Sequence, residues 1–248
     1  MSNSIEALDE LFRARLYLYF HEDMLSDKRT QVECDFMCEN LGLKNGHSLL
    51  DLACGHGRHA TALAKREIKV TAWDLNQEFI QLARKASKEQ GLEIDYQCRD
   101  ILTLEYHEEF DAIILLFNTL GFFSRAEALD LMKRMSKALK SGGKLFLDIK
   151  NRDHILKELV PFSLVERGED MMVDRLSFDP KTGTTLNQRT YLKDGKRYEV
   201  PFSMTLFNYT DIDRFSKMAG LSITKDFGHW DGRAFDQNSR RIILILEK

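Results

Sequence analysis

The feature that most constrains the fold is the segment 48–57, with the sequence Ser-Leu-Leu-Asp-Leu-Ala-Cys-Gly-His-Gly. Its first six residues form a short apolar run that only Asp51 interrupts, which is typical of a buried parallel strand. The run ends at Gly55 and Gly57, and a helical pattern follows. A strand, a glycine turn and a helix begin a βαβ unit, whose turn lets a ligand approach the backbone and whose helix offers free N–H donors. The segment therefore predicts a ligand-binding turn.

Strand-like and helical patterns alternate from this segment onward, which predicts a doubly wound, Rossmann-like α/β sheet. Helices are expected from about His56, after Asn76, whose side chain is a good cap, and after Ser124, which forms a capping box with Glu127. The expected strands are residues 48–53, 69–73, 94–98, 110–117, 144–149, 221–227 and 241–247.

The pattern changes after residue 150. Residues 162–207 contain strand-like segments separated by turn signals, of which Asp194-Gly195 is a strong signal for a tight hairpin. We therefore expect three or four antiparallel strands inserted into the α/β core. The predicted organisation is a core of residues 1–150 and 208–248, which includes an N-terminal helical lid, and an auxiliary antiparallel β subdomain of residues 151–207.

Composition narrows the class of protein. The 248 residues carry a formal net charge of −3 without a dense run of Lys and Arg, so a nucleic-acid partner is disfavoured. The longest apolar run, residues 112–117, is far shorter than the ~20 residues that span a bilayer, so no membrane partner is expected. The four cysteines show no disulfide framework, which favours a cytoplasmic protein with reduced thiols. Cys34 and Cys38 have no matching second pair, so no metal site is expected.

Four polar side chains lie at or near the carboxyl ends of successive expected strands: Asp51, Asp74, Asp100 and Asn118. Asp and Asn are common in turns, so any one of them alone carries little information. In a doubly wound sheet, however, ligands bind at the carboxyl ends of the strands. A carboxylate at Asp74 can accept hydrogen bonds from both hydroxyls of a ribose. The four residues together therefore predict a ligand that contains a nucleoside.

Asp51 separates two such ligands. NAD would place a pyrophosphate at the glycine turn, where a carboxylate would repel it. S-adenosylmethionine (SAM) instead carries an α-ammonium group and a sulfonium centre, which suit a carboxylate beside the turn. Asp100 and Ile101 fit an acceptor for the adenine amino group and an apolar contact with its ring. An NAD-linked oxidoreductase is therefore the weaker alternative.

Several motifs now resemble those of a known family. The successive motifs of class I SAM-dependent methyltransferases resemble four parts of this chain: residues 51–57, Asp74-Leu75, Asp100-Ile101 and the turn at residues 141–143. A bacterial small-molecule subgroup of that family resembles the chain further, at residues 57–59, 117–123 and 230–241. The insertion resembles the auxiliary domain of sugar N,N-dimethyltransferases. The resemblance implies a seven-stranded sheet of order 3-2-1-4-5-7-6 with strand seven antiparallel. It also implies SAM as cofactor and S-adenosyl-L-homocysteine (SAH) as its product.

The implied cofactor site combines the strand ends with a tyrosine from the N-terminal lid. One departure from the family motif is His56, where Thr or Ser is common, which removes a hydroxyl contact near the methionine carboxylate. The implied cofactor-binding residues are Tyr17, Asp51, Ala53, Gly55, Gly57, Asp74, Leu75, Asp100, Ile101, Phe117 and Asn118.

The expected function is transfer of a methyl group from SAM to a nitrogen or oxygen atom of a small-molecule acceptor by in-line displacement. The acceptor is expected between the 118–123 loop, the insertion, the N-terminal helix and the 230–238 loop. No catalytic residue is assigned, although His154, His229, Tyr209 and Asp231 lie in segments that border this region. Exposed strand edges of the insertion favour a homodimer. A methyltransferase that acts on RNA or protein is the alternative.

Overall fold

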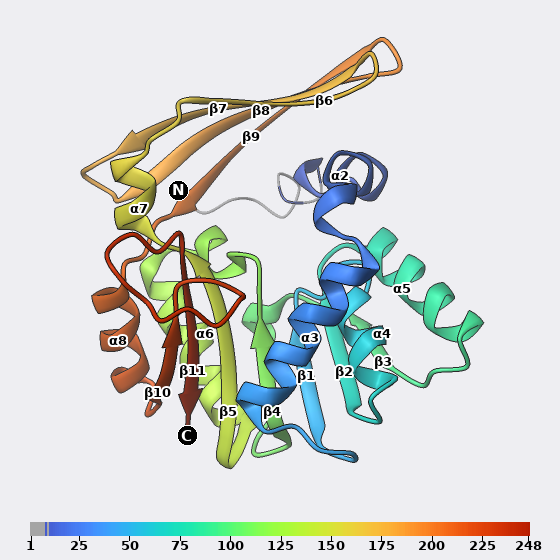
Figure 1. Ribbon diagram of the computed structural model, residues 1–248, viewed down its shortest axis with the longest axis vertical. Coiled ribbons are helices and arrows are strands. Elements are labelled where there is room, and N and C mark those ends of the chain that lie inside the picture. Colours follow the sequence, from blue (N-terminus) through green and yellow to red (C-terminus); the bar gives the residue numbers. More distant parts are fainter. Residues whose placement is uncertain (1–7, 9) are drawn as a thin grey trace.

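The computed structural model describes residues 8 and 10–248, and its centre is a mixed seven-stranded sheet (Figure 1). The strand order is β10-β11-β5-β4-β1-β2-β3, and only β11 runs antiparallel to its neighbours β5 and β10. In chain order this is the predicted 3-2-1-4-5-7-6 arrangement, which is confirmed. The strands are β1 (Ser48–Leu52), β2 (Lys69–Asp74), β3 (Asp95–Cys98), β4 (Phe110–Leu115), β5 (Leu139–Lys150), β10 (Ser222–Phe227) and β11 (Arg241–Glu247).

Helices cover both faces of this sheet because side chains alternate along each strand. On β1, Leu49 packs with α3 (Asp27–Leu41), α4 (Arg58–Ala64) and α5 (Gln77–Glu89). Leu50 and Leu52 pack on the opposite face with α6 (Arg125–Ala138) and α8 (Tyr209–Met218). The expected caps are present, because Asn76 accepts from the backbone N–H of Phe79 and Ser124 forms a capping box with Glu127.

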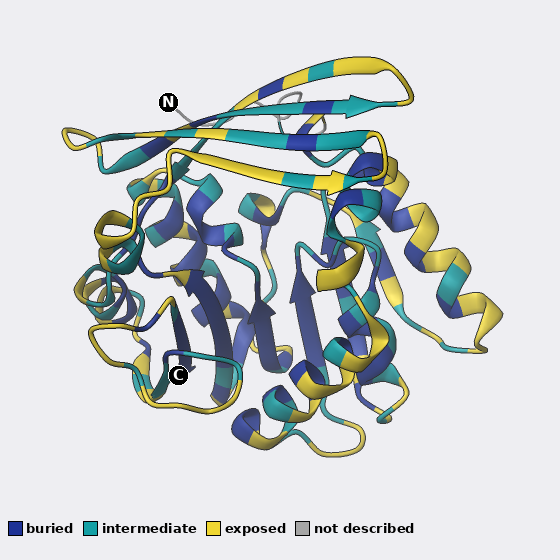
Figure 2. Cartoon of the chain, turned by 45° about the horizontal axis from the view of Figure 1, so that its top comes forward, coloured by how far each residue is buried: buried dark blue, intermediate teal, exposed yellow. Residues whose placement is uncertain are grey.

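The insertion forms a second, antiparallel sheet of order β6-β7-β8-β9, as predicted. Its strands are β6 (Phe162–Arg167), β7 (Asp170–Asp179), β8 (Thr184–Lys193) and β9 (Lys196–Thr205), and β8 and β9 are joined at Asp194 and Gly195, which both have positive φ. Pro201 lies on the edge strand β9, where no ladder N–H is required of it. These strands carry mostly exposed and intermediate residues, with a few buried ones among them (Figure 2). The division of the chain into two domains at residues 150 and 208 stays a prediction.

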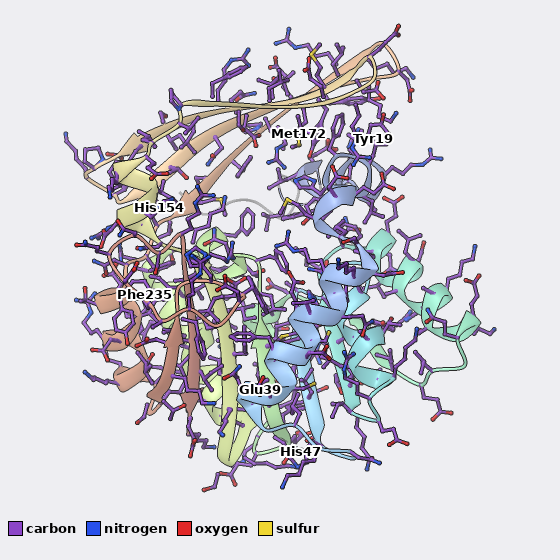
Figure 3. All side chains as sticks on the ribbon, viewed as in Figure 1. Tyr19, Glu39, His47, His154, Met172 and Phe235 are labelled. Carbon is purple, nitrogen blue, oxygen red and sulfur yellow. The ribbon has the colours of Figure 1, made fainter. Side chains whose placement is uncertain are left out.

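The auxiliary sheet lies across the carboxyl edge of the central strands, with α2 (Ala14–His21) beneath one end and α7 (Arg152–Lys157) beneath the other (Figure 1). Leu16 and Phe20 of α2 pack against Met172, Tyr191 and Val200 of the auxiliary sheet. Figure 3 shows Tyr19 and Met172 in this contact region. The space above the central strand ends is therefore covered from two directions.

Candidate cofactor site

A cavity of about 350 Å³ lies at the carboxyl ends of β1, β2 and β4 and beneath α2. All the predicted cofactor-binding residues line it except Gly57 and Asn118. Tyr17 reaches it from α2 and is held by a tilted contact with Phe12 and an edge contact with Phe79. The structure therefore brings together residues from five separate segments that the sequence could place only along the chain.

The turn after β1 is built from backbone conformations that glycine favours. Ala53, Gly55 and Gly57 have φ of 59°, 56° and 78°. Ala53 is not glycine, and such a conformation costs about 1–3 kcal/mol, which the surrounding fold must offset. Gly57 has no room for a side chain, because a Cβ there would lie 2.4 Å from Tyr96 Oη. Gly57 therefore packs α4 closely against its neighbours and does not itself line the cavity.

Asp51 is buried beside this turn and is only 2% exposed. Its Oδ2 atom has no hydrogen-bond partner among the described residues. Burial first, and then the charge of Asp74, raise the pKa of Asp51 to about 8, while Arg58 opposes the shift. An unpaired carboxylate at this depth is costly, and a cationic ligand group would offset that cost, whereas a pyrophosphate would increase it. The lining therefore fits the ammonium and sulfonium groups of SAM.

Asp74 and Asp100 line the cavity and also hold the loops around it. Asp74 accepts from the backbone N–H of Gly55 through Oδ2 (2.7 Å) and from that of Asn76 through Oδ1 (2.8 Å). Asp100 accepts from the N–H of Leu102 (2.9 Å) and so caps the short helix after β3. Each carboxylate oxygen can accept more than one hydrogen bond, so these contacts leave capacity for ligand hydroxyl or amino groups.

Phe117 and Asn118 have φ of 55° and 66°, which is unusual for two consecutive residues other than glycine. Asp148, which is fully buried, accepts from the N–H of Phe117 (3.0 Å) and is paired with Arg241. Asn118 is 3% exposed and its Oδ1 accepts from the N–H of Lys150 (2.9 Å). Phe117 thus enters the cavity, whereas the Asn118 side chain fastens the loop to β5.

The cavity also contains residues that the sequence did not single out as cofactor ligands, chiefly Arg58 and His59. Both contact Glu33 of α3, at 2.7 Å and 2.9 Å, and Arg29 adds a third contact at 2.8 Å. These partners outweigh burial and lower the pKa of Glu33 to about 2. The Arg58 guanidinium lies 4.9 Å from the ring centre of Phe117. The sequence offered no clear signal for this cluster, because Glu33 is buried only through the packing of α3 against α4.

The four residues named beside the expected acceptor site separate in the structure. Tyr209 donates to Asp226 (2.9 Å) and lines neither this cavity nor the one next to it. His154, His229 and Asp231 line the neighbouring cavity. None of the three lines the cofactor cavity, so no catalytic residue is assigned.

The fold and this cavity together define an α/β domain whose cavity, at the carboxyl edge of its sheet, fits a cationic nucleoside ligand. Residues 49–143 match the family model described as "Methyltransferase domain". The chain is 30% identical over 174 residues to a ubiquinone biosynthesis O-methyltransferase of Idiomarina loihiensis, and the match covers 58% of this chain and 70% of that protein. The chain belongs to the class I SAM-dependent methyltransferases, and its cofactor is SAM.

Solved structures agree in fold. A SAM-dependent methyltransferase from Clostridium acetobutylicum matches with a TM-score of 0.81 at 22% identity, over 94% of this chain and 96% of that one. The sugar N-methyltransferase KedS8 from a Streptoalloteichus species matches with a TM-score of 0.68 at 19% identity, over 88% and 87%. No helix in the described part of the chain is long and apolar enough to cross a membrane.

The buried Asp51 leads to a prediction about pH. The ammonium group of SAM favours ionised Asp51, but with a pKa of about 8 this residue is mostly protonated at pH 6 in the free protein. SAM affinity should therefore rise about tenfold or more between pH 6 and pH 7.5, and level off near pH 8, where the α-amino group of SAM also titrates. Burial lowers the pKa of His56 to about 4, so this residue should not contribute in this range, and burial also lowers the pKa of His59.

Calorimetry at several pH values, in buffers of different ionisation enthalpy, measures both the affinity and the proton released from Asp51. Asp51→Asn is the matched control, because it keeps the shape of the side chain and should remove the pH dependence along with much of the affinity. A wild-type affinity that is constant from pH 6 to pH 7.5 would contradict this account.

Proposed function

We propose that the enzyme transfers the methyl group of SAM to a nitrogen or oxygen atom of a small-molecule acceptor. The observation that carries the proposal is an aromatic wall, formed by Phe12, Phe122 and Phe123, that lines the cofactor cavity under the auxiliary sheet. Such a covered, largely apolar site suits a small ligand better than a polymer. The names of two similar proteins support both acceptor atoms, since one is an O-methyltransferase and the other a sugar N-methyltransferase.

The residues of the chain would act by holding and orienting. Asp74 would accept from the ribose hydroxyls, Asp100 from the adenine amino group, and Asp51 from the ammonium group. When bound, SAM supplies a methyl group on a positively charged sulfur atom. Phe117 and the aromatic wall would exclude water and restrict the approach of the acceptor. Orientation of this kind can lower a barrier by as much as about 7–11 kcal/mol. A neutral amine needs no prior deprotonation, so this arrangement requires no general base.

The test is an assay of the full chain with SAM and three groups of acceptors: small amines and phenols, unmodified tRNA, and an unmodified protein mixture. We expect SAH to form with members of the first group and not with the other two. Methylation of tRNA or protein alone would overturn the small-molecule assignment. In the same samples, thermal stabilisation by NAD but not by SAM or SAH would overturn the cofactor assignment.

Three further expectations belong to this proposal. A homodimer through the auxiliary sheet is supported by exposed apolar side chains on its edge strand β6, where Phe162 and Leu164 are 49% and 44% exposed, and by Val160 just before it, which is 61% exposed. Sedimentation velocity of the full chain would test it.

Residues 151–207 would act as the acceptor-binding subdomain. A cytoplasmic location is supported by four free cysteines and would be tested by cell fractionation.

A further inference from the structure

A second cavity, of about 660 Å³, lies beside the cofactor site on the side of α3 and α7. Its lining comes from the end of β5, from α7 and from the loop that joins β10 to β11. Figure 3 shows His154 of α7 and Phe235 of the loop on this side of the molecule. The nitrogen-bearing side chains of its lining are Lys150, His154, His229, Trp230, Arg240 and Arg241.

Two stacked aromatic rings lie between this cavity and the cofactor cavity. Phe117 lines the cofactor cavity and Trp230 lines the second one, and their ring centres are 6.4 Å apart at an interplanar angle of 23°. The backbone continues the connection, because Asn118 follows Phe117 and is hydrogen-bonded to the N–H of Lys150. A ligand in the second cavity would therefore lie across these two rings from the cofactor cavity.

Hydrogen-bond donors outnumber acceptors in this cavity. Arg241 is neutralised by its bidentate pair with Asp148. Lys150 and Arg240, by contrast, have no carboxylate within ion-pair distance among the residues that the structure describes. Within the same described part, the indole N–H of Trp230 is buried without an acceptor. Lys150 and Arg240 are both exposed, so their donors are free to bind an acceptor that comes from outside the chain.

The acidic groups nearby already have partners of their own. Asp231 is the only carboxylate among the described residues of the lining, and its own partner is Arg233, at 2.8 Å. Across the gap, Arg189 of the auxiliary sheet is already paired with Asp174, at 2.7 Å. Burial, Arg241 and Arg189 lower the pKa of Lys150, and Asp174 only partly opposes them. Two cationic side chains without a carboxylate partner, Lys150 and Arg240, thus line this cavity, in a chain whose net charge is −3.

We propose that the second cavity binds an oxyanion of the methyl acceptor, a carboxylate or a phosphate, between Lys150 and Arg240, with the apolar part of the acceptor against Trp230. This inference rests on the proposed small-molecule function and narrows it to anionic acceptors. Charge-assisted hydrogen bonds from Lys and Arg are the interactions that such groups use most effectively. Binding at one end would fix the acceptor while its nucleophilic atom points toward Phe117 and the methyl group.

The experiment uses the full chain saturated with SAH and three probes that share a phenyl ring: benzoate, phenyl phosphate and the neutral benzamide. Calorimetry at low ionic strength in phosphate-free buffer should show at least one anion binding about tenfold or more tightly than benzamide. The tighter anion identifies the group as carboxylate or phosphate. In the double variant Lys150→Met with Arg240→Gln, this preference should fall to within about twofold.

Lys157→Gln is the matched control, because it removes one positive charge from α7 at a residue outside the cavity lining and should keep the preference. The inference is overturned if neither anion binds better than benzamide, if neither binds at about 20 mM, or if the double variant keeps the preference. The initial SAH titration distinguishes a failure of the methyltransferase function from a failure of the anion site. If the wild-type chain does not bind SAH, the methyltransferase function is contradicted. If it binds SAH but shows no preference for an anion, only the proposed anion site in the second cavity is contradicted.

Discussion

Replacing Asp74 with alanine is expected to weaken SAM binding by about 100-fold or more. Two ribose hydroxyls would lose a charged acceptor, and hydrogen bonds to charged groups contribute roughly 1.5–3 kcal/mol each. The same change also removes the acceptor of the Gly55 and Asn76 N–H groups, so the glycine turn becomes less ordered. Calorimetric titration of the full chain with SAM and with SAH measures the loss.

A matched pair of ligands separates the ribose contact from the loosened turn. Wild-type protein should bind adenosine more tightly than 2′,3′-dideoxyadenosine, and Asp74→Ala should bind the two equally. Thermal unfolding without ligand then measures the loss of fold stability that the loosened turn alone causes. A variant that binds SAM as tightly as wild-type protein would show that the ribose does not contact Asp74.

Replacing Gly57 with alanine is expected to destabilise the fold by roughly 2–4 kcal/mol. Its φ of 78° is unfavourable for any residue with a Cβ, and that Cβ would lie 2.4 Å from Tyr96 Oη and 2.9 Å from Ala83 Cβ. Tyr96 is 3% exposed, so its ring has little room to move away. Urea unfolding monitored by circular dichroism measures the change.

Gly55→Ala is the control for this prediction. Gly55 also has positive φ, but no atom lies within 4 Å of the Cβ that the substitution would add, so only the backbone cost of about 1 kcal/mol is expected. Adding Tyr96→Phe to Gly57→Ala should recover part of the stability, because it removes the nearest clashing atom. If Gly55→Ala and Gly57→Ala lower the free energy of unfolding by the same amount, the packing explanation is refuted.

The sheet and the acidic strand ends were predictable because their signals are local. The apolar runs, glycine turns and helix caps each depend on neighbours within a few residues, and they define both sheets. Asp51, Asp74 and Asp100 follow from the same patterns, because parallel strands present their carboxyl ends at one edge. The choice of SAM over NAD rested on the charge of Asp51, to which Asp100 added support.

The remaining features depend on contacts between residues far apart in the sequence. Gly57 and Asn118 match a cofactor motif, yet one packs against Tyr96 and the other fastens the chain to Lys150. Glu33 reaches Arg58 and His59 only because α3 packs against α4. Lys150 and Arg240 line one cavity because β5 pairs antiparallel with β11, which brings these two parts of the chain together. Such surroundings are absent from a linear pattern, because burial, pKa and unsatisfied charge arise only when distant segments meet.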